Sequence, residues 1–250
     1  MYNAIILAGG PVNRDLESLG KGKYEAFLDL DGRPMVSYVV DALLASPSID
    51  KIVAVGPLEE LSQLFVDRRI ICVEERGDII GNLLAALDNL PEEKVLVVTC
   101  DLPFLTPEAV EDFLDRCSAK EADFYYPIVR KKDSEARFPG SQRTYVHLKE
   151  GVFTGGNIFL LTPRVIRENL DYARKIVALR KHPFKLARLL GLKFICKFIF
   201  KLLSLEDLER KIYELLHLRG AAIISPYPEI GVDVDKKSDF DLACLILNRS

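Results

Sequence analysis

The residues of this 250-residue sequence best suited to chemistry are aspartates at the ends of short apolar runs. Asp101 follows the most strand-like run of the chain, KVLVVT, after a single cysteine. Carboxylate oxygens are the ligands that Mg²⁺ prefers, and the cation is commonly shared with substrate phosphates. We therefore expect Asp101 to bridge a metal and a substrate. The alternative is a turn or N-cap aspartate.

Two further aspartates, Asp233 and Asp235, lie near the end of the chain in the run GVDVD. In a strand, successive side chains point to opposite faces. Only one of the two would then share a metal with Asp101. The other would cap the last helix or orient a neighbouring group.

A glycine turn follows the first apolar run, Ala4–Leu7, and reads Ala8-Gly9-Gly10. Because glycine has no Cβ, its backbone N–H groups approach an anion closely. Together with Arg14 as a fixed cation, the turn predicts a phosphate site. The alternative is a tight turn without a ligand, since neither the GxGxxG nor the GxxxxGK[ST] spacing is present.

A second polar turn, Thr154-Gly155-Gly156-Asn157, combines backbone amides with a hydroxyl and a carboxamide. This combination suits sugar hydroxyls or a phosphate, and a plain glycine-rich turn is the alternative. The three histidines are far apart and share no ligand spacing, so we assign them no catalysis. No Ser-His-Asp or zinc pattern is recognisable in the sequence.

The elements that must position these residues alternate between strand and helix in the first half of the chain. Strands separated by helices with short connections indicate a mostly parallel sheet with helices on both faces. Ligands of such α/β, Rossmann-like sheets lie at the carboxyl ends of the strands, where both the glycine turn and Asp101 fall. We expect strands at 4–7, 51–55, 70–73 and 94–99, and helices at 35–44, 58–65, 77–90 and 107–117.

The second half of the chain is less regular. Arg130–Arg143 reads as a charged loop of the kind that covers a substrate, and Ser238 is the expected cap of the last helix. We predict one domain over residues 1–250, with a helical insert at 163–219. Further strands are expected at 123–129, 145–148, 157–161, 221–224 and 232–234.

A basic segment, Arg174–Lys201, contains nine lysines and arginines and no acid. Within it, Gly191–Leu203 repeats lysine every fourth residue among large apolar residues. Such a helix suits a membrane surface or a lipid-linked substrate. The alternative is a helix whose apolar face packs on the domain or on a second copy of the chain, which would give a homodimer.

Composition narrows the class of protein. A 49% hydrophobic content fills a sizeable core, and a formal charge of -3 argues against a general nucleic-acid binder. The five cysteines form no CxxC pair and read as reduced thiols. With no recognisable signal peptide, these features predict a cytoplasmic protein.

Five motifs taken together resemble the nucleotidyltransferase superfamily, most closely its MobA-like branch of molybdenum-cofactor guanylyl- and cytidylyltransferases. The resemblance implies the Rossmann-like fold of the nucleotide-diphospho-sugar transferase type. The motifs are LAGG at Leu7–Gly10, GRPMV at Gly32–Val36, GDIIGNLLAAL at Gly77–Leu87, CDLPFLTPEAV at Cys100–Val110 and DVDKKSDFDL at Asp233–Leu242.

The resemblance also implies an activity: transfer of a nucleotidyl group from an NTP, with GTP or CTP favoured, to a phosphorylated acceptor, with release of pyrophosphate. The acceptor would be a sugar phosphate or a cofactor phosphate. Two alternatives remain, a type A glycosyltransferase that uses an NDP-sugar and a non-catalytic nucleotide-binding protein.

Residue by residue, the resemblance implies that Leu7, Ala8, Gly9 and Gly10 hold the base and phosphates of the NTP. It places Mg²⁺ on Asp101, completed by Asp233 or Asp235. The family commonly has a lysine where this chain has Glu25, so Lys21 or Lys23 would reach the phosphates instead. The expected catalytic residues are Arg14, Lys23 and Asp101, and Gly81, Asn82 and Thr154–Asn157 are expected to bind nucleotide or acceptor.

Overall fold

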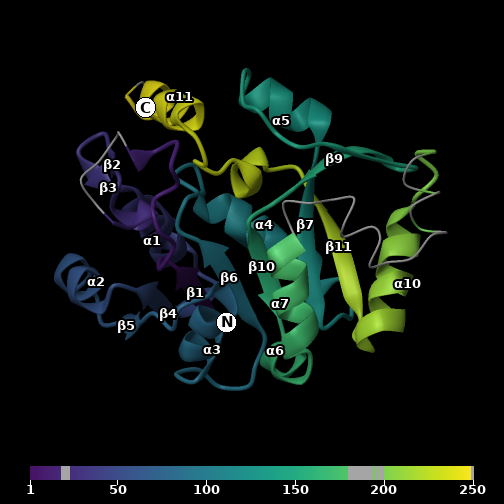
Figure 1. Cartoon of the computed structure of the whole chain (residues 1–250), viewed down its shortest axis with the longest axis horizontal. Helices are drawn as coiled ribbons and strands as arrows, with labels where there is room; N and C mark the ends of the chain where they lie inside the picture. Colours follow the sequence, from purple (N-terminus) through teal and green to yellow (C-terminus); the bar gives the residue numbers. More distant parts are fainter. Residues whose placement is uncertain (18–22, 180–193, 195–196, 198–199, 249–250) are drawn as a thin grey trace.

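The computed structural model describes residues 1–17, 23–179, 194, 197 and 200–248. Its centre is a nine-stranded mixed sheet (Figure 1). The strand order is β5 (Ile70–Glu74), β4 (Ile49–Gly56), β1 (Tyr2–Leu7), β6 (Val95–Thr99), β10 (Ile158–Leu161), β7 (Phe124–Arg130), β9 (Gly151–Gly155) and β8 (Val146–Leu148), with β11 (Gly220–Ser225) also pairing with β7.

The first four strands of this order are parallel, as the alternation of strand and helix predicts. Their apolar runs are buried on both faces: Ile5 and Ile6 are both fully buried but belong to cores on opposite sides of the sheet. Helices α1 (Met35–Ala45), α2 (Leu58–Leu64) and α4 (Pro107–Ser118) cover the Ile6 side. On the Ile5 side lie α3 (Ile79–Leu87), α6 (Pro163–Glu168) and α7 (Leu170–Leu179).

Two predicted helix starts are confirmed by their caps. The Asp78 carboxylate accepts a hydrogen bond from the Gly81 N–H at 2.6 Å, at the start of α3. The Thr106 hydroxyl accepts one from the Ala109 N–H at 3.2 Å, ahead of Pro107 in α4. Both caps satisfy N–H groups that the helix itself leaves unpaired.

The second half of the sheet reverses direction at β10, which pairs antiparallel with both β6 and β7. Strand β9, antiparallel to β7, includes Thr154 and Gly155, which are expected to begin the polar turn Thr154–Asn157. The predicted loop Arg130–Arg143 contains helix α5 (Lys131–Arg137), which follows β7 directly. Figure 1 shows α5 and α11 (Lys237–Leu247) above the same edge of the sheet, with the short turn η3 (Pro228–Gly231) between them.

Two predictions for the C-terminal segment are wrong. Residues 232–234 form no strand, because after η3 the backbone passes across the edge of the sheet instead of pairing along it. The last helix begins after Lys236, whose N–H donates to the Asp239 carboxylate at 3.1 Å. The cap is therefore this side chain reaching back, and Ser238 lies inside the helix.

The predicted insert at 163–219 contributes α6, α7 and α10 (Leu205–Leu216) to the described part of the chain, and α10 packs beside β11. Most of the basic run Gly191–Leu203 lies outside the described residues. None of the described helices has the length and apolar character needed to cross a bilayer. Among the described cysteines, Cys72, Cys100, Cys117 and Cys244 are free thiols.

Helix α10 begins at a charged capping arrangement. The Ser204 hydroxyl accepts a hydrogen bond from the Asp207 N–H at 3.2 Å, and Asp207 accepts one from the Ser204 N–H at 3.3 Å. The Asp207 side chain, only 9% exposed, also accepts from Lys197 at 2.7 Å and Arg210 at 2.5 Å. The hydrogen bond from Lys197 lowers the pKa of Asp207 well below its ordinary value.

The substitution Asp207→Asn should lower the free energy of unfolding by about 1–3 kcal/mol at neutral pH, since two cations lose their charged acceptor. A depressed folded-state pKa stabilises the protein fully above the ordinary value of 3.8 and progressively less as the pH falls below it. Urea unfolding at neutral pH and at about pH 3 tests this. Glu206→Gln, exposed in the same turn, is the control, and a difference undiminished at low pH would contradict the account.

Candidate active site at the carboxyl edge of the sheet

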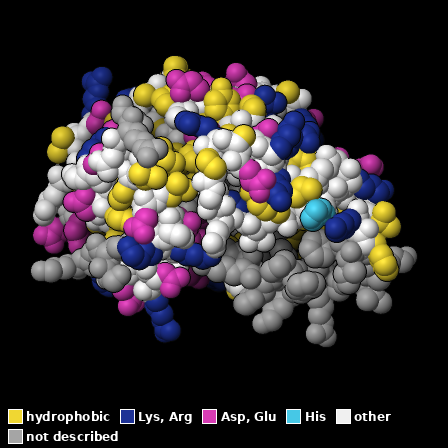
Figure 2. Space-filling view, turned by 90° about the horizontal axis from the view of Figure 1, so that it is seen from above, with side chains coloured by type: hydrophobic (Ala, Val, Ile, Leu, Met, Phe, Trp, Pro, Cys, Tyr) yellow, Lys and Arg dark blue, Asp and Glu magenta, His cyan; other side chains and the backbone are white. Residues whose placement is uncertain are grey.

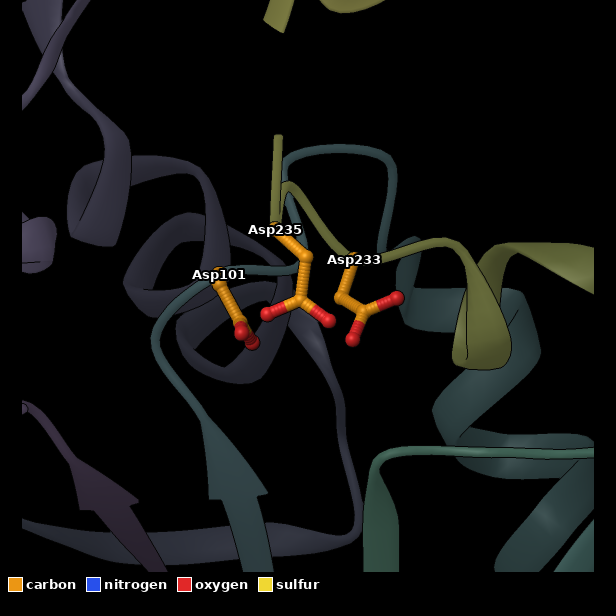
Figure 3. Close-up of side chains that lie close together, drawn as sticks. All are labelled: Asp101, Asp233 and Asp235. Carbon is orange, nitrogen blue, oxygen red and sulfur yellow. The ribbon is translucent and has the colours of Figure 1, made fainter. Parts of the chain in front are cut away.

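Three aspartates meet at the edge where β6 ends. Asp101, Asp233 and Asp235 each offer a carboxylate oxygen, and these oxygens lie within 4.8 Å of one another. Figure 3 shows the three side chains converging from two segments, the loop after β6 and the segment before α11. The expectation that only one of the last two would reach Asp101 is wrong, because residues 232–236 are not held to the alternation of a paired strand.

Two hydrogen bonds hold the C-terminal segment in this position. The Val234 N–H donates to the Asp101 carbonyl oxygen at 3.0 Å. The Asn13 side-chain amide donates to the Asp235 carbonyl oxygen at 3.0 Å, which ties the glycine turn to the same segment. The backbone of both aspartates is thereby fixed at this edge, and both side chains turn toward Asp101.

The electrostatics of the cluster favour a cation. The Asp101 Oδ1 atom is buried and has no hydrogen-bond partner among the described residues. Burial, reinforced by the charge of Asp233, raises the pKa of Asp101 from 3.8 to about 7. Three carboxylates that share little water repel one another, and a divalent cation between them would remove that repulsion.

One basic side chain already contacts the cluster. Arg143 forms an ion pair with Asp233, and each of the two side chains is 14% exposed. The Tyr126 hydroxyl packs against Gly155 nearby, while Tyr126 as a whole is 38% exposed. Sequence reasoning missed both residues: Arg143 ended the predicted charged loop, but no spacing connects it with an aspartate 90 positions away.

The glycine turn after β1 packs against the start of α3. A Cβ atom on Gly9 would lie 2.5 Å from Glu75 Oε2 and 2.8 Å from Asn82 Nδ2, so a larger residue there would displace the ends of these two side chains. The Asn82 side-chain oxygen accepts from the Arg76 N–H at 2.6 Å, and Glu75 accepts from the Tyr24 hydroxyl at 2.7 Å. The structure thus brings Asn82 to the turn, and it adds Glu75, which sequence reasoning missed.

The predicted cations lie at the rim of this turn. Arg14 and Lys23 are exposed, and neither forms an ion pair within the described part of the chain. The Lys23 ammonium lies 5.2 Å from the centroid of the Tyr24 ring. Lys21 lies outside the described residues.

Glu25 braces the glycine turn. One of its carboxylate oxygens accepts a hydrogen bond from the Asn13 N–H at 2.9 Å, and its own N–H donates to the Gly10 carbonyl oxygen at 3.2 Å. Val12 and Lys23 add a backbone hydrogen bond at 3.0 Å. The residue that replaces the family's lysine therefore holds the backbone of the turn.

The second polar turn, Thr154–Asn157, does not expose the backbone amides that the sequence predicts to be available there. The Gly156 N–H donates to the Pro127 carbonyl oxygen at 2.9 Å, and the Asn157 N–H donates to Ile230 at 2.8 Å. Thr154 is buried in β9, and Gly155 packs under the Tyr126 hydroxyl. The group that remains available to a ligand is the Asn157 side chain, because its Nδ2 atom is buried without a partner among the described residues.

A model of the MobA-like NTP transferase domain matches residues 4–190, well over half of the sequence. This chain belongs to the MobA-like NTP transferase family. The predicted resemblance and the predicted class, an enzyme of the nucleotidyltransferase type, are confirmed. The match includes Asp101 and the glycine turn and ends before Asp233 and Asp235.

Relatives with assigned activities match part of this MobA-like chain. The 2-C-methyl-D-erythritol 4-phosphate cytidylyltransferase of Thermotoga neapolitana is 29% identical over 160 residues, which are 61% of this chain and 69% of that protein. The molybdenum cofactor guanylyltransferase of Shewanella putrefaciens is 28% identical over 123 residues, 48% of this chain and 60% of that protein. The shared stretch thus spans about two thirds of these relatives.

Solved structures confirm the fold over the whole chain. A hypothetical transferase from Thermus thermophilus is 41% identical, with a TM-score of 0.84 over 96% of this chain and 99% of that one. The 4-diphosphocytidyl-2C-methyl-D-erythritol synthase of Anaerococcus prevotii, 13% identical, has a TM-score of 0.60 over 100% of this chain and 96% of that one. At that identity the likeness is one of fold alone.

The carboxylate cluster of this MobA-like protein should cost stability when no cation is present. Because the folded-state pKa of Asp101 is raised, the stability of the parent protein should fall as the pH rises from about 4 to about 7 and stay low above that. Without divalent cations at about pH 8, Asp101→Asn should be more stable than the parent by on the order of 2 kcal/mol. The difference should vanish near pH 4.

Thermal unfolding with EDTA and with Mg²⁺ measures both effects. Mg²⁺ should raise the unfolding temperature of the parent protein and leave that of Asp101→Asn unchanged. Asp115→Asn, which removes the same charge from an exposed position of α4, should behave like the parent. A parent protein indifferent to both pH and Mg²⁺ would remove the argument for a cation at this cluster.

Proposed function

We propose that this protein is a Mg²⁺-dependent nucleotidyltransferase that moves an NMP group from an NTP to a phosphorylated small molecule and releases pyrophosphate. The observation that carries the proposal is the convergence of Asp101, Asp233 and Asp235 beside the glycine turn, with Asp101 Oδ1 buried and unpartnered among the described residues. Such an arrangement suits a reaction in which the negative charge of the substrate phosphates must be neutralised by a bound cation.

Asp101, Asp233 and Asp235 would hold the cation. Oxygen ligands of this kind suit Mg²⁺, which commonly shares its coordination with substrate phosphates. When bound, Mg²⁺ supplies charge neutralisation and polarises phosphoryl oxygens. The chain itself then has to bind and orient the two substrates for in-line displacement, because phosphoryl transfer asks for positioning more than for a protein nucleophile.

The nucleotide would lie along the turn from Leu7 to Gly10. Gly9 lies close to the Asn82 side chain, and the Gly81 N–H is held by the Asp78 cap of α3, so backbone and carboxamide groups line this turn. Arg14 and Lys23, exposed at the rim, would meet the outer phosphates of the NTP. Their lack of ion pairs within the described part of the chain leaves both charges available.

The acceptor would lie on the other side of the aspartates, toward Thr154–Asn157. The buried Asn157 carboxamide nitrogen lacks a partner among the described residues and offers a hydrogen bond there. The relatives' names favour CTP or GTP as the nucleotide and a phosphorylated acceptor. Figure 2, seen from above the edge that carries α5 and α11, shows basic and acidic side chains interspersed, which supports a small-molecule partner over nucleic acid.

Two finer expectations stay proposals: the role of the run Gly191–Leu203 and the cytoplasmic location. The run Gly191–Leu203 would lie on a membrane surface, bind a lipid-linked substrate or pack on a second copy of the chain. The four described cysteines, all free thiols, support the cytoplasmic location expected from the sequence.

The substitution Asp101→Asn should leave the protein folded and lower Mg²⁺-dependent turnover by about a hundredfold or more, because it removes a metal-binding charge and keeps the shape. The measurement is release of pyrophosphate from each of the four NTPs with a panel of sugar phosphates and cofactor phosphates. Asp115→Asn should retain full turnover. Near-parental turnover in Asp101→Asn would exclude Asp101 as a metal ligand. Transfer from an NDP-sugar without pyrophosphate would favour a glycosyltransferase.

A second candidate function is a nucleotide-binding protein without turnover, and the observation that favours it is Glu25 in place of the family's lysine. Its carboxylate lies beside the turn and would repel a triphosphate. Its hydrogen bond from the Asn13 N–H, however, gives it a structural task in shaping the turn. The two candidate functions therefore predict different effects of a charge change at Glu25.

On the enzyme proposal, Glu25→Gln should leave the fold intact and lower the KM for NTP by about threefold to tenfold, because it keeps an acceptor for Asn13 and removes a repelling charge. Glu25→Lys should change NTP affinity modestly. Glu17→Gln, exposed in the same segment, controls for net charge. If Glu25→Lys gains pyrophosphate-releasing activity that the parent lacks, the parent is a binding protein.

A further inference from the structure

We infer that Arg143 stands in for the metal at Asp233 and becomes a phosphate-binding residue once the metal takes its place. In the metal-free site it neutralises that carboxylate. In the loaded site its guanidinium is released toward an oxyanion of the substrate. The inference rests on the proposed function, because it adds a substrate-binding residue to the same site.

The first observation is the ion pair itself. Arg143 contacts Asp233, and both side chains are 14% exposed, so the pair is shielded from water. Within the described part of the chain, Arg143 is the one lysine or arginine that forms an ion pair with the three aspartates. A largely buried carboxylate and guanidinium hold together strongly unless another charged group replaces one of them.

The second observation is that this guanidinium is incompletely used. Its Nε atom is buried and has no partner among the described residues. A guanidinium presents five N–H donors in a planar fork that matches carboxylate and phosphate oxygens in pairs. A buried donor without a protein partner is costly, so the Nε–H of Arg143 is suited to donate to a ligand oxygen.

The third observation is that other unpartnered polar atoms belong to the same stretch of chain. Of the eight buried side-chain atoms without a partner among the described residues, four lie between positions 134 and 145. The four atoms are Ser134 Oγ, Ser141 Oγ, Arg143 Nε and Tyr145 Oη. Residues 134–145, which run from within α5 to the start of β8, therefore offer hydrogen-bonding groups that no described residue satisfies.

Charge balance explains the exchange. Three carboxylates and one guanidinium leave the cluster with two net negative charges, and a divalent cation would bring the sum to zero. Asp233 would then bind the divalent cation, and that cation would repel the Arg143 guanidinium. An anionic substrate group beside the metal would pair with both the metal and the Arg143 guanidinium. A phosphate matches the planar pair of N–H donors of that guanidinium.

The ligand class is thus a phosphate oxyanion, which comes either from the NTP or from the acceptor. Tyr126 marks the acceptor side of Arg143. Its ring stacks on Phe159, with centroids 5.7 Å apart, and its hydroxyl packs against Gly155. The inference therefore needs two binding measurements, one with a triphosphate and one with a monophosphate.

The first measurement is Mn²⁺ binding by calorimetry in the absence of phosphates. Arg143→Gln should bind Mn²⁺ about threefold to tenfold more tightly than the parent, because the competing guanidinium is gone. Arg143→Lys should resemble the parent, since it keeps a competing charge. Lys132→Gln, which removes a charge from an exposed position of α5, measures the effect of net charge alone. An Arg143→Gln affinity equal to or below that of Lys132→Gln overturns the inference.

The second measurement is phosphate binding with Mg²⁺ present at saturation. Arg143→Gln should bind its phosphate ligand about tenfold or more weakly, and Arg143→Lys should fall between it and the parent. The probes are inorganic phosphate and α,β-methylene analogues of CTP and GTP. Weakening confined to inorganic phosphate assigns Arg143 to the acceptor, and weakening confined to the analogues assigns it to the NTP. Unchanged affinity for every probe overturns the inference.

The outcome for the parent protein separates this inference from the proposed function. If the parent binds neither Mn²⁺ nor any of the phosphate probes, the proposed function fails and the inference fails with it. If the parent binds them and releases pyrophosphate, but Arg143→Gln binds both cation and phosphates as the parent does, the function stands and only the role of Arg143 is lost.

Discussion

The hydrogen bond from the Val234 N–H to the Asp101 carbonyl oxygen, 3.0 Å long, is the contact on which the candidate site depends. It joins the end of strand β6 to a segment more than a hundred residues later in the chain. Asn13 reinforces it by donating to the Asp235 carbonyl oxygen. Because these contacts bring the carboxylates together, cation binding and the docking of the C-terminal segment should stabilise each other.

The same contacts impose an electrostatic cost. Burial raises the pKa of Asp101 to about 7, and Asp233 is near enough to add to that rise. The adjacent Cys100 thiol, also buried, has its pKa raised well above the ordinary value. Arg143 compensates part of the negative charge, and the rest is left for a ligand. Sites that bind charge commonly sacrifice local stability in this way.

Much of the fold follows from local patterns. The apolar runs of β1, β4, β5 and β6 predict buried parallel strands because each run is short, continuous and followed by a turn signal. The caps at Asp78 and Thr106 are predictable because a cap needs only its own neighbours. These elements fix the edge of the sheet and place the glycine turn and Asp101 side by side.

What the sequence does not predict depends on distant partners. Strand β9 reads as a turn because of its glycines, yet Gly155 is there to admit the Tyr126 hydroxyl. The last helix is capped by Asp239 instead of Ser238, because the helix begins after Lys236 and the Asp239 carboxylate accepts from the Lys236 N–H. Arg143 and Glu75 acquire their positions from contacts far along the chain, so no local spacing could identify them.

The comparisons cover the two segments of the candidate site unequally. The family model covers residues 4–190, and the relatives with assigned activities match still less of the chain. Within the matched part lie Asp101, the glycine turn and Asn82. Asp233 and Asp235 lie beyond it. The relatives' names therefore bear on the matched part of the site, whereas Asp233 and Asp235 reach it from a segment that the family model does not cover.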